Sequence, residues 1–296
     1  MDALLFLQQG LNGLQLGMML FLMAAGLTLV FGIMDLINLA HGSFYMLGAY
    51  IAAWATGAIG AFLPALALAM LATAAIGVIV ERTTLRRLYA RDHLYQVLAT
   101  FGLILFLNEL VAVLFGPQPI FASPPPLLAG QVELFGAPYP AFRLSIILVG
   151  AATALGLWWL VGRTRLGMLI RAGADNREMA AALGVDVARL YTGVFALGAA
   201  LAALAGAMAG PVLAVRIGMG EDILILTFVV IVIGGIGSVR GAFAGALLVG
   251  LTDTFGRAYL PAVMGAAGAS LASMAIYIVM ALVLAFRPRG LFPAAA

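Results

Sequence analysis

Long runs of apolar residues fill most of the chain, and short polar stretches separate them. A helix that crosses a bilayer needs about 20 apolar residues, because the hydrocarbon core is roughly 30 Å thick. Runs near this length occupy 11–33, 39–60, 62–80, 95–115, 143–161, 190–214, 222–239, 242–258 and 268–286. The pattern therefore predicts an all-α polytopic membrane protein of about eight to nine transmembrane helices, with residues 1–296 forming a single integral membrane domain.

The composition supports this prediction and excludes several kinds of chemistry. Only 9% of the residues are charged, against about 25% in soluble domains. All 15 basic residues are arginines and Cys is absent, which excludes a P-loop or Schiff-base lysine, disulfides and thiolate metal sites. With only two histidines, His41 and His93, we expect no metal site and no catalytic residue. We also see no basic face suited to nucleic acid.

The arginines indicate how the chain is oriented. Eleven of them fall in the stretches 82–91 and 163–189 and at the C-terminal pair Arg287 and Arg289. By the positive-inside rule these stretches lie in the cytoplasm, which places the N-terminus outside. Met1 and Asp2 precede the first apolar run without a cationic leader, so we expect no cleaved signal peptide.

The region 116–142 lies on the outer side in this scheme. It holds seven of the 12 prolines, which disfavour helix and lower the entropy lost on ordering. We therefore expect an ordered Pro-rich periplasmic loop.

A polar patch interrupts the apolar pattern at 34–43. Polar groups at this depth are costly unless they face a cavity or one another, and broken backbone in a membrane must be satisfied by protein or water. One interpretation is a broken helix that lines a pathway, with Asn38, His41, Ser43 and Tyr45 as its lining. The other is a tight cytoplasmic turn in which Asp35 or Asn38 caps the next helix.

A second unusual segment, 234–245, is rich in glycine. Gly237, Gly241 and Gly245 repeat every four residues, a spacing that lets two helices approach closely, and the pair at 234–235 favours a helix break. Close packing accounts for all of this except Arg240. A moving or substrate-adjacent break, with Gly237 and Gly241 beside the pathway, is the alternative.

The two segments align at an offset of 199 residues. Leu27 and Thr28 match Leu226 and Thr227, and the triplet beginning at Gly42 falls on the one beginning at Gly241. Internal repeats are common in transporters, whose sites lie between the repeats.

The loop 163–189 contains a short amphipathic helix. Asp175 and Glu178 have the spacing of a capping box, Gly184 is placed for a left-handed C-cap, and Asp186 can cap the following helix. Such a short helix is marginal by itself. It therefore either docks in a groove of a partner protein or lies on the membrane through Met179 and Leu183.

Two further polar features lie deep in apolar runs. Asn108 and Glu109 form an adjacent polar pair, and Asp253 lies near the middle of another run. A hydrogen bond between helices is the simplest interpretation of each.

These motifs together resemble a known family. The segment 26–32, followed by 37–42 and 44–50, looks like the N-terminal signature of the bacterial branched-chain amino acid ABC permeases of the LivH type. The stretch 171–184 is similar to the cytoplasmic coupling segment of that family, and 234–245 resembles its glycine-rich signature.

The resemblance implies a transport subunit of the bacterial inner membrane that itself catalyses no reaction. Its implied partners are a second related permease, two cytoplasmic ATPases that bind ATP and Mg²⁺, and a periplasmic substrate-binding protein, so this chain would need no cofactor. It also implies that the ATPases dock on Glu178, Met179, Ala180, Ala181, Leu183 and Gly184.

Two alternatives remain open. The same type of permease is used by relatives that carry urea or short amides. A secondary transporter driven by an ion gradient would instead use acidic residues such as Asp35, Glu109 or Asp253.

Overall fold

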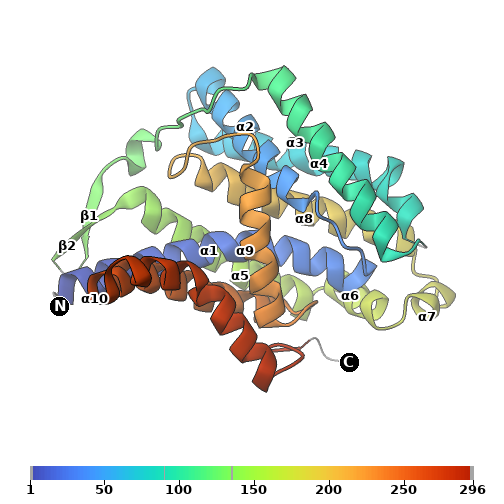
Figure 1. The fold of residues 1–296 in the computed structure, drawn as a ribbon. Helices are drawn as coiled ribbons and strands as arrows, with labels where there is room; N and C mark the ends of the chain where they lie inside the picture. The colour runs from blue at the N-terminus through green and yellow to red at the C-terminus, as the bar shows by residue number, and fades with distance from the viewer. Residues whose placement is uncertain (1–2, 90, 135, 294–296) are drawn as a thin grey trace. The chain divides into compact units, whose positions relative to one another are not determined.

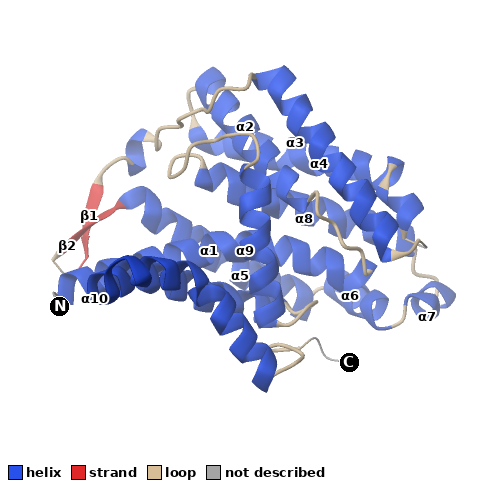
Figure 2. Cartoon of the chain, in the orientation of Figure 1, coloured by secondary structure: helices blue, strands red, loops and turns tan. Residues whose placement is uncertain are grey.

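The computed structural model describes residues 3–89, 91–134 and 136–293, and helices make up most of it (Figure 2). Two short antiparallel strands pair between Gln131 and Leu134 and between Ala137 and Pro140. In chain order the elements are α1 (Ala3–Met34), α2 (His41–Ile59), α3 (Phe62–Thr83), η1 (Leu85–Leu88), α4 (His93–Phe115), η2 (Pro126–Leu128), β1 (Gln131–Leu134), β2 (Ala137–Pro140), α5 (Ala141–Arg163), α6 (Arg165–Asp175), α7 (Arg177–Ala182), α8 (Val187–Ala209), α9 (Met219–Gly234) and α10 (Val239–Phe286).

Six helices of the described part are long and apolar enough to cross a membrane, namely α1, α3, α4, α5, α8 and α10. The multi-pass helical class is therefore confirmed, whereas the number of eight or nine spans stays a prediction. The expected spans 242–258 and 268–286 lie on either side of Gly265, whose non-helical backbone (φ of 57°) divides the 48-residue element α10 into two helices. A Cβ atom on Gly268 would collide with the carbonyl oxygen of Leu260, and one on Gly256 would lie 3.7 Å from the Cα atom of Ala272, so the two helices pack side by side. The expected span 222–239 is the 16-residue helix α9.

The described residues form two compact units. The first unit comprises Met1–Ala24, Pro124–Ala154 and Leu226–Ala295, and the second comprises Ala25–Ser123 and Leu155–Ile225. Helices α1, α5 and α9 each contribute residues to both units.

In the second unit, α2, α3 and α8 pack against one another (Figure 1). Small residues bring their backbones close together. A Cβ atom on Gly206 of α8 would collide with the carbonyl oxygen of Tyr45, and one on Gly48 of α2 would collide with Ala203. Because helices in lipid gain stability from close backbone packing rather than from the hydrophobic effect, these glycines fix the α2–α8 contact.

In the first unit, α1 packs on α10 in the same way. A Cβ atom on Gly17 would lie 2.9 Å from the carbonyl oxygen of Ala246, and one on Gly13 would lie 2.9 Å from the side chain of Leu251. The guanidinium of Arg143 on α5 donates to the side-chain oxygen of Asn12 at 3.0 Å.

The described residues of the Pro-rich region include short regular elements. The region forms η2 and the β1–β2 hairpin, and a separate backbone bridge joins Ile120 to Val215 within the second unit. In the hairpin, burial raises the pKa of Tyr139 to about 12, although the nearby Arg143 acts in the opposite direction.

The internal repeat is visible in the helix ends. Helix α1 ends at Met34 and α2 begins at His41, while α9 ends at Gly234 and α10 begins at Val239. At the offset of 199 these ends agree to within one residue. The matched segments thus share a helix, a break of a few residues and a second helix.

Candidate functional site

The polar patch at 34–43 is a buried helix break. Asp35 adopts a left-handed backbone conformation with φ of 47°, after which the chain runs without helix to His41. Asn38, His41 and Ser43 are at most 2% exposed. The N-cap position of α2 is Ala40, with no side-chain cap, so neither Asp35 nor Asn38 caps this helix as the alternative interpretation required.

This break places the beginning of α2 beside the middle of α8. A Cβ atom on Gly26 of α1 would lie 3.0 Å from His41 Nε2 and 2.7 Å from the carbonyl oxygen of Gly198. Gly198 is 11 residues into α8, about 16 Å from its beginning at 1.5 Å per residue. Helix α2 therefore begins roughly halfway along α8, not at its end.

Helix α9 begins at the same place. Gly42 in the first turn of α2 and Gly220 in the first turn of α9 are in backbone contact, so a Cβ atom on either would collide with the other. Two helix N-termini thus meet inside the second unit, and their partial positive charges favour anionic groups. Broken helices of this kind form the substrate sites of many transporters.

Glu221, the residue after Gly220, forms a polar pair with α4. Asn108 Nδ2 donates to Glu221 Oε1 at 2.6 Å. The sequence suggested Glu109 as the neighbour of Asn108 in a deep polar pair, but Glu109 is exposed and Glu221 takes that place. Two residues 113 positions apart leave no local pattern, which is why sequence reasoning missed Glu221.

The remaining residues expected near the pathway fall in two places. Tyr45 is buried with Asn38, His41 and Ser43 in the second unit. Gly237 belongs to the α9–α10 turn of the first unit, and Gly241 to the first turn of α10, where it is in backbone contact with Gly234. Close packing and the positive φ of 80° at Gly237 therefore explain why glycine occurs there.

The short helix of the loop 163–189 is α7. Its N-cap is Asn176, whose side chain accepts a hydrogen bond from the backbone of Met179 at 2.9 Å. The expected capping box at Asp175 is wrong by one residue, because Asp175 still belongs to α6. Gly184 has the expected left-handed conformation, with φ of 89°, and Asp186 caps α8 through the backbone of Arg189 at 3.0 Å.

Helix α7 presents an exposed apolar surface. The side chains of Met179 and Leu183, one helical turn apart, are 58% and 79% exposed, whereas Ala180 is 3% exposed. Glu178, Ala181 and Gly184 are exposed as well. Ala180 thus holds α7 against the protein, and the other expected docking residues form a surface accessible to a partner.

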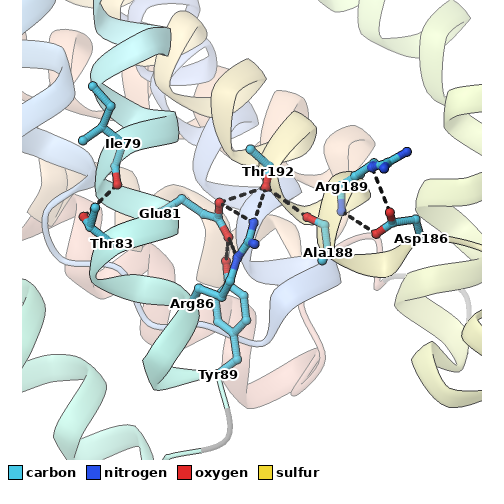
Figure 3. A network of polar contacts seen from close by, with 9 residues as sticks. All are labelled: Ile79, Glu81, Thr83, Arg86, Tyr89, Asp186, Ala188, Arg189 and Thr192. Carbon is cyan, nitrogen blue, oxygen red and sulfur yellow. Dashed lines mark hydrogen bonds and ion pairs between the residues drawn. The ribbon is translucent and has the colours of Figure 1, made fainter.

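A polar network that the sequence did not reveal lies where α7 leads into α8 (Figure 3). The carboxylate of Glu81 on α3 is fully buried and accepts hydrogen bonds from Arg86, Tyr89 and Thr192 at 2.7–3.1 Å. Arg86 also donates to the hydroxyl of Thr192 at 2.7 Å. The network ties the first turns of α8 to the end of α3. Its only local signal was an acid in an apolar run with an arginine five residues later.

The same network changes the acidity of its members. Burial, followed by the hydrogen bond to Glu81, raises the pKa of the Tyr89 phenol, so Tyr89 remains a neutral donor. The hydrogen bond to Glu81 is also the main reason why the pKa of Arg86 is raised. Each partner is therefore held in the protonation state that the network needs.

A multi-pass helical protein with a buried helix break and an exposed short helix has the architecture expected of a membrane transport subunit. The family model described as "Branched-chain amino acid transport system / permease component" matches residues 10–284. The chain therefore belongs to this permease family.

Individual relatives agree with this assignment. The chain is 32% identical to the high-affinity branched-chain amino acid transport system permease protein BraD of Pseudomonas aeruginosa, over 97% of this chain and 95% of that protein. It is 32% identical to LivH of Salmonella typhimurium over 87% of this chain and 88% of that protein. The ribose import permease protein RbsC of Escherichia coli is 28% identical over 78% of this chain and 72% of that protein. No solved structure matches the chain.

Proposed function

We propose that this chain is the membrane-spanning subunit of an ATP-driven importer that moves branched-chain amino acids across the bacterial inner membrane. The full-length similarity to BraD and LivH supports this cargo, because the similarity to the sugar permease is lower and covers less of the chain. In this proposal a periplasmic binding protein delivers the amino acid, and a second related permease completes the passage. The observation that carries the proposal is the match to the permease family over residues 10–284.

Two ATPase subunits would dock on α7 in this proposal. The exposed side chains of Met179 and Leu183 can enter a groove of a partner, and the small Ala181 lets the backbone approach closely. ATP and Mg²⁺ bind to those subunits and supply the energy, so this chain holds no cofactor and contributes no catalytic residue.

A displacement of α7 can be transmitted to the membrane helices through a few direct contacts. The residues 183–186 join α7 to α8, Asp186 caps α8, and Thr192 links α8 to Glu81 of α3. ATP-driven closure of the partner subunits would displace α7, and α8 and α3 would follow together. The bundle would thereby alternate between outward and inward states.

The helix break supplies the polar lining of the path. In the proposal Asn38, His41, Ser43 and Tyr45 bound the route in the second unit, and Gly237 and Gly241 permit movement of the α9–α10 turn in the first. A branched-chain amino acid needs an apolar passage with a few polar groups, which matches the mainly apolar residues around this break.

Reconstitution of the whole complex tests the function. Proteoliposomes that hold both permeases and the ATPases should import labelled leucine only with ATP and the loaded binding protein. Uptake driven by a proton or sodium gradient without ATP would refute the proposal in favour of a secondary transporter. Import of urea or short amides in place of leucine would refute the cargo alone.

Docking is tested by Leu183→Ser. The variant should lose most of the ATPase that co-purifies with the wild-type permease, while Leu166→Ser, at an exposed leucine of α6, should retain it. Equal retention by both variants would refute docking on α7. Leu183 is preferable to Gly184 for this test, because any side chain at Gly184 also strains its left-handed backbone.

A further inference from the structure

The pair formed by Asn108 and Glu221 contains two hydrogen-bond acceptors but no donor for them. Asn108 Nδ2 already donates to Glu221 Oε1. Asn108 Oδ1 and Glu221 Oε2 are buried and have no hydrogen-bond partner among the described residues. Buried polar atoms normally have a hydrogen-bond partner, so this pair has the chemistry of a binding site for a group that donates hydrogen bonds.

The pair lies well inside the membrane-spanning part. Asn108 belongs to α4, a span from His93 to Phe115, and is about 6 Å from the middle of this helix at 1.5 Å per residue. The N-terminus of α9, where Glu221 lies, supplies only a partial positive charge, so a carboxylate at such depth is still costly unless a full cation balances it. The nearest arginine along the chain, Arg216, forms an ion pair with Asp222.

The surroundings connect this pair to the helix break. Glu221 follows Gly220, which contacts Gly42 of α2, and the backbone nitrogen of Ser43 lies 3.1 Å from a Cβ position on Gly220. The side chain of Ser43 is 2% exposed, and its hydroxyl has no hydrogen-bond partner among the described residues. A third buried polar group without a hydrogen-bond partner, the Ser43 hydroxyl, therefore lies in the first turn of α2, the other helix that begins here.

We propose that Glu221 and Asn108 bind the ammonium group of the transported amino acid, with Ser43 beside them. This inference rests on the proposed function, which supplies a cargo with one ammonium group. An ammonium carries three N–H donors and one positive charge. It therefore donates hydrogen bonds to both free acceptors and also balances the charge of the carboxylate. A neutral solute can donate hydrogen bonds but cannot balance the charge.

The test measures leucine uptake and ATP hydrolysis together in proteoliposomes that hold the complete complex and the loaded binding protein. In Glu221→Gln, the leucine imported per ATP should fall by about tenfold or more, the size of a lost charge-assisted hydrogen bond. ATP hydrolysis stimulated by the binding protein should stay within about twofold of wild type, because the docking surface on α7 is intact.

Two further variants separate recognition from folding. Glu221→Asp keeps the charge and should recover part of the uptake that Glu221→Gln loses. Glu109→Gln changes the exposed acid that follows Asn108 on α4 and should keep the wild-type ratio of uptake to hydrolysis.

Several outcomes would overturn the inference. These are wild-type coupling in Glu221→Gln, a parallel loss of hydrolysis and complex assembly, and equal defects in Glu221→Gln and Glu221→Asp. Uptake that depends on a proton or sodium gradient, with the dependence lost in Glu221→Gln, would identify an ion site instead. Wild-type uptake without ATP would refute the proposed function itself, independently of these variants.

Discussion

The Glu81 network allows a quantitative prediction about stability. Glu81→Gln preserves the shape of the side chain but replaces one acceptor oxygen by an NH₂ group, which faces the donors of Arg86 and Thr192. Glu81 has no exposed surface and accepts four hydrogen bonds, whereas the side chain of Arg86 is 40% exposed and can regain water. Breaking a buried charge pair costs about 3–5 kcal/mol, and the exposure of Arg86 favours the lower limit. We therefore expect a loss of about 3 kcal/mol, which lowers the ratio of folded to unfolded protein roughly 100-fold.

The assay is unfolding of the purified permease by SDS in mixed micelles, followed by tryptophan fluorescence. Arg189→Gln serves as the control, because it removes the exposed ion pair with Asp186 and leaves the cap on the backbone intact. Such a surface pair contributes about 0–1 kcal/mol. A loss in Glu81→Gln no larger than that in Arg189→Gln would refute the view that the network holds α3 and α8 together.

Three further predictions concern particular positions. Gly184→Ala should destabilise α7 by about 1 kcal/mol through its left-handed backbone alone, since no atom lies within 4 Å of the new methyl group; unchanged hydrogen exchange in 177–184 would contradict this. Gly206→Ala should disrupt the contact with Tyr45 and lower the free energy of unfolding, whereas Gly57→Ala, in open space on α2, should leave the free energy of unfolding unchanged or raise it by up to about 1 kcal/mol. The folded-state pKa of Tyr139 is raised to about 12. The neutral phenol therefore makes its full contribution to the free energy of unfolding below pH 10, and this contribution is lost as the pH rises through about 12. The difference in absorbance at 295 nm between wild type and Tyr139→Phe should show this late titration, and a midpoint near 10 would contradict it.

Local patterns in the sequence were sufficient to predict several features of the structure. Charged residues bound α3, α4, α5 and α8, so these helices lie close to the expected spans. The break before His41 was visible because polar residues are rare within a membrane-spanning run and are costly there unless protein or water satisfies them. Gly184 and Asp186 were predictable because their roles depend only on neighbouring backbone.

The features that depend on distant partners were not predictable. Glu81 meets Thr192 across 111 residues, and Glu221 meets Asn108 across 113, so neither pair leaves a periodic signal. The first helix of α10 also continues through Pro261 as far as the break at Gly265, beyond its expected end at 258, although proline usually ends a helix in water. In lipid, neighbouring helices and local adjustment can satisfy the freed backbone groups, so a proline there need not end the helix.

The backbone contact between Gly42 and Gly220 has a consequence for how cargo preference changes during evolution. Neither position accepts a side chain, since a methyl group on one would collide with the other backbone. At this crossing, size and polarity can therefore change only at the next residue of each helix, Ser43 and Glu221. If these residues contact the cargo as proposed, a combinatorial library at the two positions should contain permeases of altered selectivity, whereas libraries at the two glycines should yield mainly misfolded protein.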